Sequence, residues 1–217
     1  MKNDVADIVK GLIELQRRYA FEARMIISEE RFVNFQRLMP TKYNDLDYAE
    51  EMLREPLIEH VGHLPIIATY LHQFIEHTKH VDLGRALIML SIHDIGETVL
   101  GDIFTFEKTH SQEVDEHKVA LKQLPSYLQQ YLIEYEKRDT YHAKFAKAVD
   151  SIAPLLHEMV APELTYHRFA KWNFNTQMIY QKKLNDFKWD KILSEIFELI
   201  IGEYKKIEKN QKTIFVS

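Results

Sequence analysis

The stretch DLGRALIMLSIHDIGETVLGDI, from Asp82 to Ile103, decides the predicted fold. Its centre, ALIMLSI, is apolar on every side of a helix, so the sequence predicts a buried core helix from Leu83 to about Leu100 with Asp82 as N-cap. Such a helix needs other helices to cover it. His93 and Asp94 lie toward its end, where a buried charge requires an opposite charge or a metal ion.

The rest of the chain also favours helices. Only six Gly and six Pro occur among 217 residues, and Leu, Ile, Glu, Lys and Ala are abundant. Amphipathic patterns predict helices at about 4–27, 112–124, 127–138, 141–156 and 191–206, with Ser111, Thr140 and Asp190 as caps and a start or bend at Pro65. We therefore predict an all-α fold: one helical domain over residues 1–217, with its motifs in a core at about 55–157.

The net charge and the cysteine content indicate which binding partners and which cellular compartment to expect. The 28 basic and 33 acidic residues give a formal net charge of −5, which does not favour nucleic acid. Because Cys is absent, metal ligands must be nitrogen or oxygen atoms, and a reducing compartment is expected. The segment MKNDVADIVKGLIEL lacks the apolar core of a signal peptide, and no later stretch reaches membrane-spanning length. We expect a soluble cytoplasmic protein that binds neither nucleic acid nor membrane.

The His93-Asp94 doublet has a structural alternative: a hydrogen-bonded core histidine beside an aspartate that accepts backbone N–H groups. Two further residues favour a metal ion, namely His60 at the start of the preceding helix and Asp150 between apolar positions of a later one. Two imidazoles and two carboxylates suit one Mn²⁺, Co²⁺, Fe²⁺, Zn²⁺ or Mg²⁺ ion and leave positions open for water and a phosphate oxygen. Such an ion activates its water and polarises the phosphoryl oxygen.

Three segments resemble the signatures of HD-domain 5′-deoxynucleotidases: Glu59-His60, HDIGETVLGDI from His93 to Ile103, and KFAKAVDSIAPLL around Asp150. The resemblance covers about residues 60–156, and it depends on three separated motifs in the same order. It implies a compact helical bundle, commonly a homodimer, that removes the 5′-phosphate from deoxynucleoside monophosphates. The metal ligands that it implies are His60, His93, Asp94 and Asp150.

The resemblance also implies roles around the metal. Glu97 matches the residue that activates water or protonates the leaving oxygen. Asp102 and Thr105 match a loop that holds the sugar and the phosphate. Lys108 is a weaker candidate for a phosphate contact. The structural alternatives are an exposed carboxylate at a helix end, a loop turn and a solvated surface lysine, respectively.

The family's selector for 2′-deoxy substrates is not matched. That selector is an Arg-Trp pair upstream of the first histidine, whereas this chain has no Trp before Trp172, which leaves Arg37 or Arg54 as loose candidates. A second metal ion near His63 is a further alternative, although histidines on exposed helix faces are common.

The sequence thus predicts a metal-dependent phosphohydrolase that acts on a small phosphoester, a nucleoside or deoxynucleoside 5′-monophosphate, by attack of metal-bound water. Two alternatives stay open. One is hydrolysis of another phosphoester or of a nucleotide pyrophosphate, and the other is a metal-containing module that binds a nucleotide without turnover.

Overall fold

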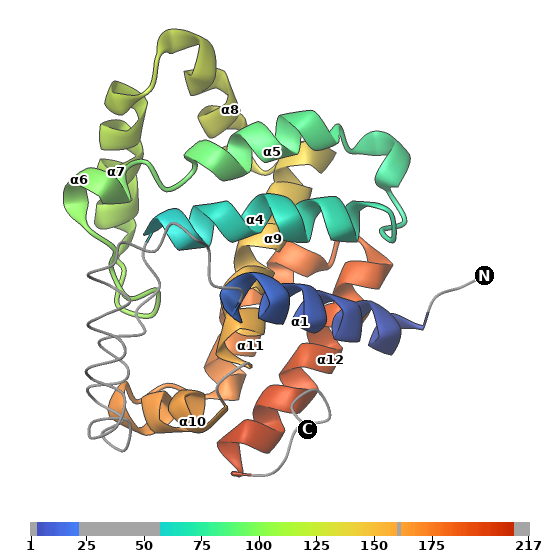
Figure 1. The fold of residues 1–217 in the computed structure, drawn as a ribbon. Helices are drawn as coiled ribbons and strands as arrows, with labels where there is room; N and C mark the ends of the chain where they lie inside the picture. The colour runs from blue at the N-terminus through green and yellow to red at the C-terminus, as the bar shows by residue number, and fades with distance from the viewer. Residues whose placement is uncertain (1–3, 22–56, 160–161, 211–217) are drawn as a thin grey trace. The chain divides into compact units, whose positions relative to one another are not determined.

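The computed structural model describes residues 4–21, 57–159 and 162–210 (Figure 1). Helices and their connecting turns make up these ranges, in which no strand occurs, so the all-α prediction is confirmed. The described residues divide into two compact units. One comprises Leu57–Ala153 with Asn185–Ser194, and the other comprises the remaining described residues. None of the described helices is both long and apolar enough to span a membrane.

The unit that contains the predicted metal ligands is built around two helices that pack side by side, α4 and α5 (Figure 1). Helix α5 also packs against α8, and α6 packs against α7. Side chains from α4, α5 and α9 fill the core, among them Leu64, Leu71, Met89, Leu90 and Phe145. The elements of this unit are α4 (Leu57–His72), the 3₁₀ turn η1 (Thr78–His80), α5 (Leu83–Ile92), α6 (Glu97–Leu100), α7 (His110–Gln123), α8 (Ser126–Lys137) and most of α9 (Tyr141–Glu158).

Of the two predictions for Pro65, a helix start is wrong, because α4 runs from Leu57 to His72 with Pro65 inside it, and a bend there stays a prediction. Proline in a helix interior costs about 3 kcal/mol. The apolar residues around it, from Leu64 to Leu71, include four fully or almost fully buried side chains, and their burial offsets that cost. The uninterrupted helix places His60 in its first turns, on the same element as this core.

Helix α5 begins as predicted and ends earlier. Asp82 is its N-cap, and its side chain accepts a hydrogen bond from the backbone N–H of Arg85. The helix ends at Ile92, not near Leu100, because the chain turns through residues 93–96 before α6 starts. The prediction that the apolar run is buried on every side was also wrong, since Ser91 is exposed.

Gly96 accounts for this turn. A Cβ atom at Gly96 would lie 2.8 Å from both the carbonyl oxygen and Cγ of Glu116, so only glycine lets the turn approach α7 this closely. Below the turn, Ile92 of α5 packs with Ala120, Leu124 and Leu132 in one buried cluster. The close approach of Gly96 to α7 and the packing of Ile92 together fix the position of the residues on either side of Gly96.

The caps of α7 and α9 lie close to the predicted positions. Thr109, not Ser111, caps α7, because Thr109 and Gln112 form a capping box in which each side chain bonds the other's backbone N–H. Thr140 caps α9 as predicted: its hydroxyl accepts a hydrogen bond from the N–H of Ala143 at 3.2 Å. Helix α9 continues through Pro154 to Glu158.

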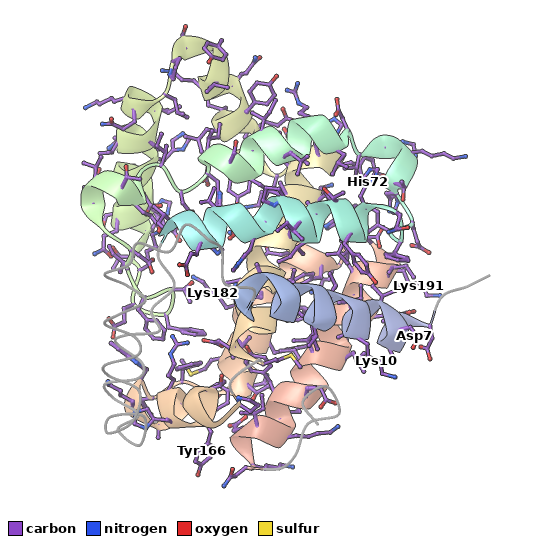
Figure 2. The ribbon with its side chains drawn as sticks, viewed as in Figure 1. Asp7, Lys10, His72, Tyr166, Lys182 and Lys191 are labelled. Carbon is purple, nitrogen blue, oxygen red and sulfur yellow. The ribbon has the colours of Figure 1, made fainter. Side chains whose placement is uncertain are left out.

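The second unit contains α1 (Val5–Phe21), α10 (Pro162–Lys171), the end of α9, and most of α11 (Thr176–Phe187) and α12 (Lys191–Glu208). Fully buried Tyr204 donates hydrogen bonds to the Leu155 carbonyl oxygen and the Glu158 carboxylate. Figure 2 shows Asp7 and Lys10, an exposed pair on the first turns of α1. The prediction that the first helix extends to Ile27 falls beyond the described residues.

Candidate metal centre

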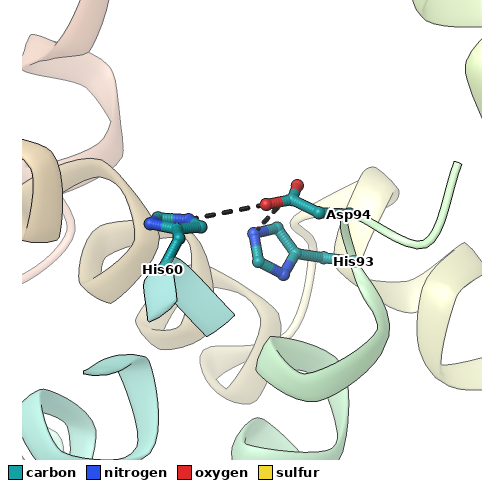
Figure 3. Close-up of side chains that lie close together, drawn as sticks. All are labelled: His60, His93 and Asp94. Atoms are coloured by element: carbon teal, nitrogen blue, oxygen red, sulfur yellow. Dashed lines mark ion pairs between the residues drawn. The ribbon is translucent and has the colours of Figure 1, made fainter. Parts of the chain in front are cut away.

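His93 and Asp94 open the turn between α5 and α6 (Figure 3). The imidazole of His93 is buried, and its Nδ1 lies 3.0 Å from the carbonyl oxygen of Leu90. A proton on Nδ1 satisfies this carbonyl and leaves the lone pair of Nε2 for another partner. The helix that ends here therefore sets the tautomer and the direction of the histidine.

Side chains from α4 and α9 meet the doublet. His60 Nε2 lies 3.5 Å from Asp94 Oδ2 and 3.3 Å from Asp150 Oδ1. His93 Nε2 lies 3.1 Å from Asp94 Oδ1 and 3.3 Å from Asp150 Oδ1. The structure thus brings together the four residues predicted as metal ligands, from three segments that are far apart in the sequence.

Two observations show that these residues fit a divalent cation. Nε2 of His93 is fully buried and makes no hydrogen bond of acceptable geometry to any residue that the structure describes, although two carboxylate oxygens lie near it. Adjacent donors about 2.1 Å from one ion lie about 3.0–3.4 Å apart, which agrees with the separations of 3.1–3.5 Å between the His and Asp atoms here. His60, His93 and Asp94 form a candidate ligand group whose donor atoms all lie within 4.8 Å of one another.

In the absence of an ion, the carboxylates of Asp94 and Asp150 favour the protonated, positively charged form of His93. Burial lowers the pKa of His93, but the nearby charges of Asp94 and Asp150 outweigh burial and raise that pKa to about 10. Burial acts in the opposite sense on Asp150, yet Lys147 and His93 hold its pKa well below the usual value. A cation bound at this centre would therefore have to displace a proton from His93.

Asp150 is held from behind by two donors that the sequence did not reveal as site residues. The hydroxyl of Tyr135, on α8, donates to Asp150 Oδ2 at 2.8 Å. The ammonium group of Lys147, one turn earlier on α9, donates to the same oxygen at 2.7 Å. The buried ring of Tyr135 also packs on the imidazole of His93, with ring centroids 5.2 Å apart. The spacing of Lys147 and Asp150 was a local signal for their ion pair, whereas nothing near Tyr135 in the sequence pointed to this contact.

Glu97, the predicted acid or base, begins α6 directly after the turn. Burial, together with the negative charges of Asp94, Asp102 and Glu116, raises its pKa to about 8. The positive charge of Lys108 opposes this rise, and its Nζ lies 3.8 Å from Glu97 Oε1 and 2.5 Å from Glu116 Oε2. A carboxyl group with this pKa carries a proton at neutral pH and is suited to donate it.

The other predicted contacts have different surroundings. Asp102 lies within electrostatic reach of Asp94 and His60, and burial is the main cause of its raised pKa. Thr105 is exposed in the following turn and is not hydrogen-bonded to a ligand residue in the part of the chain described. Lys108 is mostly buried and ion-paired, so it is not a solvated surface lysine. Arg37 and Arg54 lie outside the described residues.

A second group of possible ligand atoms occurs in the same unit, and it does not include His63. It consists of Glu76, His77 and Asp190. Asp190 Oδ1 accepts hydrogen bonds from the backbone N–H groups of Ile192 and Leu193, as the sequence predicts for the cap of the last helix. Asp190 Oδ2 accepts from the backbone N–H of His77 and lies 3.0 Å from its Nδ1. Its oxygens are already used, so we assign this group a structural role.

Comparison with known families agrees with this geometry. The model of the HD-domain family matches residues 48–192, more than half of the chain. The chain belongs to the HD-domain family. The match includes all four residues of the candidate centre and all but the last two residues of the unit that carries them.

Individual relatives of this HD-domain chain are distant. A 5′-deoxynucleotidase from Schizosaccharomyces pombe is 28% identical over 50% of the chain and 55% of its own length, so the match spans about half of that relative. A 5′-deoxynucleotidase from Bos taurus is 24% identical over 67% of the chain and 70% of its own length. A crystal structure from Magnetospirillum magnetotacticum, described as a predicted metal-dependent phosphohydrolase, is 26% identical with a TM-score of 0.61, over 77% of this chain and 85% of that one.

Proposed function

We propose that this chain is a metal-dependent phosphomonoesterase that acts on nucleoside or deoxynucleoside 5′-monophosphates. The observation that carries the proposal is the meeting of two imidazoles and two carboxylates with separations of 3.1–3.5 Å, one of the imidazole nitrogens being buried without a hydrogen bond. The two 5′-deoxynucleotidase relatives support the substrate class. His60, His93, Asp94 and Asp150 would hold the ion.

When bound, the ion would supply an activated water and polarise the phosphoryl oxygen. The residues of the chain would do the rest. In the overall reaction, the oxygen of water bonds to phosphorus, the bond from phosphorus to the sugar oxygen breaks, and one proton lost by that water balances the proton that the sugar oxygen gains. Glu97 is the donor that we propose, because it follows the His93-Asp94 turn directly and its partial burial favours the protonated carboxyl group. Asp102 and Thr105 would contact the substrate, and Lys108 would keep the acidic cluster from repelling a phosphate.

The proposal is tested with purified protein that is stripped of metal, reloaded with Mn²⁺ or Co²⁺, and assayed for hydrolysis of a panel of nucleotides. We expect release of inorganic phosphate from 5′-monophosphates, and at least about a 100-fold loss in Asp94→Asn. Asp115→Asn is the matched control, because Asp115 is an exposed aspartate on α7. Activity that survives Asp94→Asn would refute the proposal. Release of pyrophosphate would instead indicate another HD-type hydrolase, and tight nucleotide binding without any product would indicate a binding module.

We also propose the finer assignments that follow from the resemblance: a single ion of Mn²⁺, Co²⁺, Fe²⁺, Zn²⁺ or Mg²⁺, one HD-type domain, a homodimer, and a cytoplasmic location. Anomalous scattering from crystals identifies the ion, and sedimentation of the purified chain measures the number of copies. A monomer at micromolar concentration would contradict the homodimer.

A further inference from the structure

The two oxygens of Asp150 have different surroundings, and the difference bears on how the centre holds its ion. Oδ1 lies 3.3 Å from Nε2 of both His60 and His93. Oδ2 receives the hydroxyl of Tyr135 at 2.8 Å and the ammonium group of Lys147 at 2.7 Å. One oxygen therefore faces the imidazoles, while the other faces two donors.

A carboxylate oxygen has about two lone-pair positions for hydrogen bonds. Two donors at these distances occupy both positions on Oδ2. Neither donor moves easily, because Tyr135 is 3% exposed and its ring packs on His93. Lys147 is itself placed over the ring of Tyr135, with its Nζ 5.6 Å from the ring centroid. Rotation of Asp150 would break both hydrogen bonds.

We propose that Tyr135 and Lys147 are positioning residues that restrict Asp150 to a single oxygen facing the metal. This inference rests on the proposed metal centre. A carboxylate that chelates an ion through both oxygens occupies two coordination positions, and one that uses a single oxygen occupies one. Occupation of Oδ2 by protein donors thus keeps one position free for water or for a phosphate oxygen, which is what a hydrolytic centre requires.

The test is to remove both donors in Tyr135→Phe/Lys147→Met, which keeps the ring and the length of the aliphatic side chain. Freed of its partners, Oδ2 joins Oδ1 on the ion. We expect the variant to bind Mn²⁺ at least as tightly as wild type, because a second oxygen and the loss of a positive charge both favour the cation. Water proton relaxation with bound Mn²⁺ should report about one fewer exchangeable water. The kcat for phosphate release should fall about 10-fold or more, with little change in KM.

Tyr131→Phe/Lys144→Met is the matched control, with the same substitutions one turn earlier on the same two helices. Tyr131 lies under Arg85, and Lys144 lies over Tyr141, away from Asp150. This control should keep the wild-type number of waters and the wild-type kcat. Lys147→Arg, which retains a charged donor, should also keep most of both.

Tighter Mn²⁺ binding combined with slower turnover separates positioning from a merely structural role, which would weaken Mn²⁺ binding and lower the melting temperature. An unchanged water number in the double variant, or weaker Mn²⁺ binding, overturns the inference and leaves the proposed function intact. Wild-type protein that binds no Mn²⁺ refutes both. If the double variant does not fold by circular dichroism, Tyr135→Phe alone removes one donor without a change of shape, and its water number decides the question.

Discussion

Two clusters of histidine and carboxylate side chains lie in the same unit of this chain, and they differ in how their lone pairs are used. Around His93, the donor atoms of four residues lie close together, and one buried imidazole nitrogen has no hydrogen bond among the described residues. Around Asp190, both carboxylate oxygens accept hydrogen bonds, from the first turn of α12 and from His77. Residue types alone do not separate a metal centre from a helix cap. The partners of each oxygen and nitrogen do.

The largest expected effect is on Mn²⁺ affinity, which a substitution in the first cluster should lower and a substitution in the second should leave unchanged. Asp94→Asn should weaken Mn²⁺ binding by at least about 100-fold, because it removes a charged ligand from the first cluster. Asp190→Asn should leave Mn²⁺ affinity unchanged, since the oxygens of Asp190 serve backbone N–H groups. Isothermal titration with Mn²⁺ measures both affinities. The comparison fails if Asp190→Asn loses Mn²⁺ binding as severely as Asp94→Asn.

The next effect concerns the turn that carries the first cluster. Gly96→Ala would place a Cβ atom 2.8 Å from Cγ and from the backbone oxygen of Glu116, so α7 or the turn must shift. We expect a loss of about 1–3 kcal/mol in the free energy of unfolding, and weaker Mn²⁺ binding as well. Gly62→Ala is the matched control, because nothing lies within 4 Å of a Cβ atom there and alanine favours a helix. Urea unfolding measures both variants, and equal stability would show that the contact at Gly96 is relaxed at little cost.

A substitution in the second cluster should lower the free energy of unfolding and leave phosphate release nearly unchanged. Asp190→Ala removes the cap of α12 and should cost about 1–2 kcal/mol in the free energy of unfolding. Phosphate release at a temperature where the variant is folded should stay within about twofold of wild type, because the carboxylate of Asp190 accepts its hydrogen bonds from His77 and from the first turn of α12. A large loss of activity in the folded variant would argue that this cluster contributes to catalysis.

The smallest effect is a pH dependence of the metal-free protein. Because burial and nearby acids raise the pKa of Glu97 from 4.5 to about 8, the folded state holds this proton more tightly than the unfolded state. The stability that Glu97 contributes is therefore complete below about pH 4.5 and is lost as the pH rises through about 8. Because solvent screens a partly exposed group, we expect a change on the order of 1 kcal/mol.

Glu97→Gln should remove that dependence. The free energy of unfolding of the variant should therefore rise relative to that of wild type as the pH increases from 5 to 9. Glu113→Gln is the control, because Glu113 is an exposed glutamate on α7. Urea unfolding in the presence of a chelator gives these differences. A constant difference across the pH range would mean that the pKa of Glu97 is not raised.

Local sequence was enough for α7, α8, α9 and α12 and for three of the four predicted caps. Asp82, Thr140 and Asp190 cap the helices that follow them because each bonds a backbone N–H within three residues, a contact that does not depend on the rest of the fold. The errors came where distant packing acts on the local pattern. Helix α5 stops at Ile92 because the turn at Gly96 lies against α7, and α4 passes through Pro65 because its core face is buried.

The sequence by itself determined the helical class, because residue type and short-range spacing contain that information, and it supplied the candidate metal ligands through three separated motifs that resemble a known family. Only the tertiary structure decided that His60 and Asp150 meet the His93-Asp94 doublet, that Tyr135 and Lys147 hold one oxygen of Asp150, and that Glu97 lies among acids that raise its pKa. These contacts join segments that are distant in the chain, and their charges interact through an environment that exists only after the helices pack.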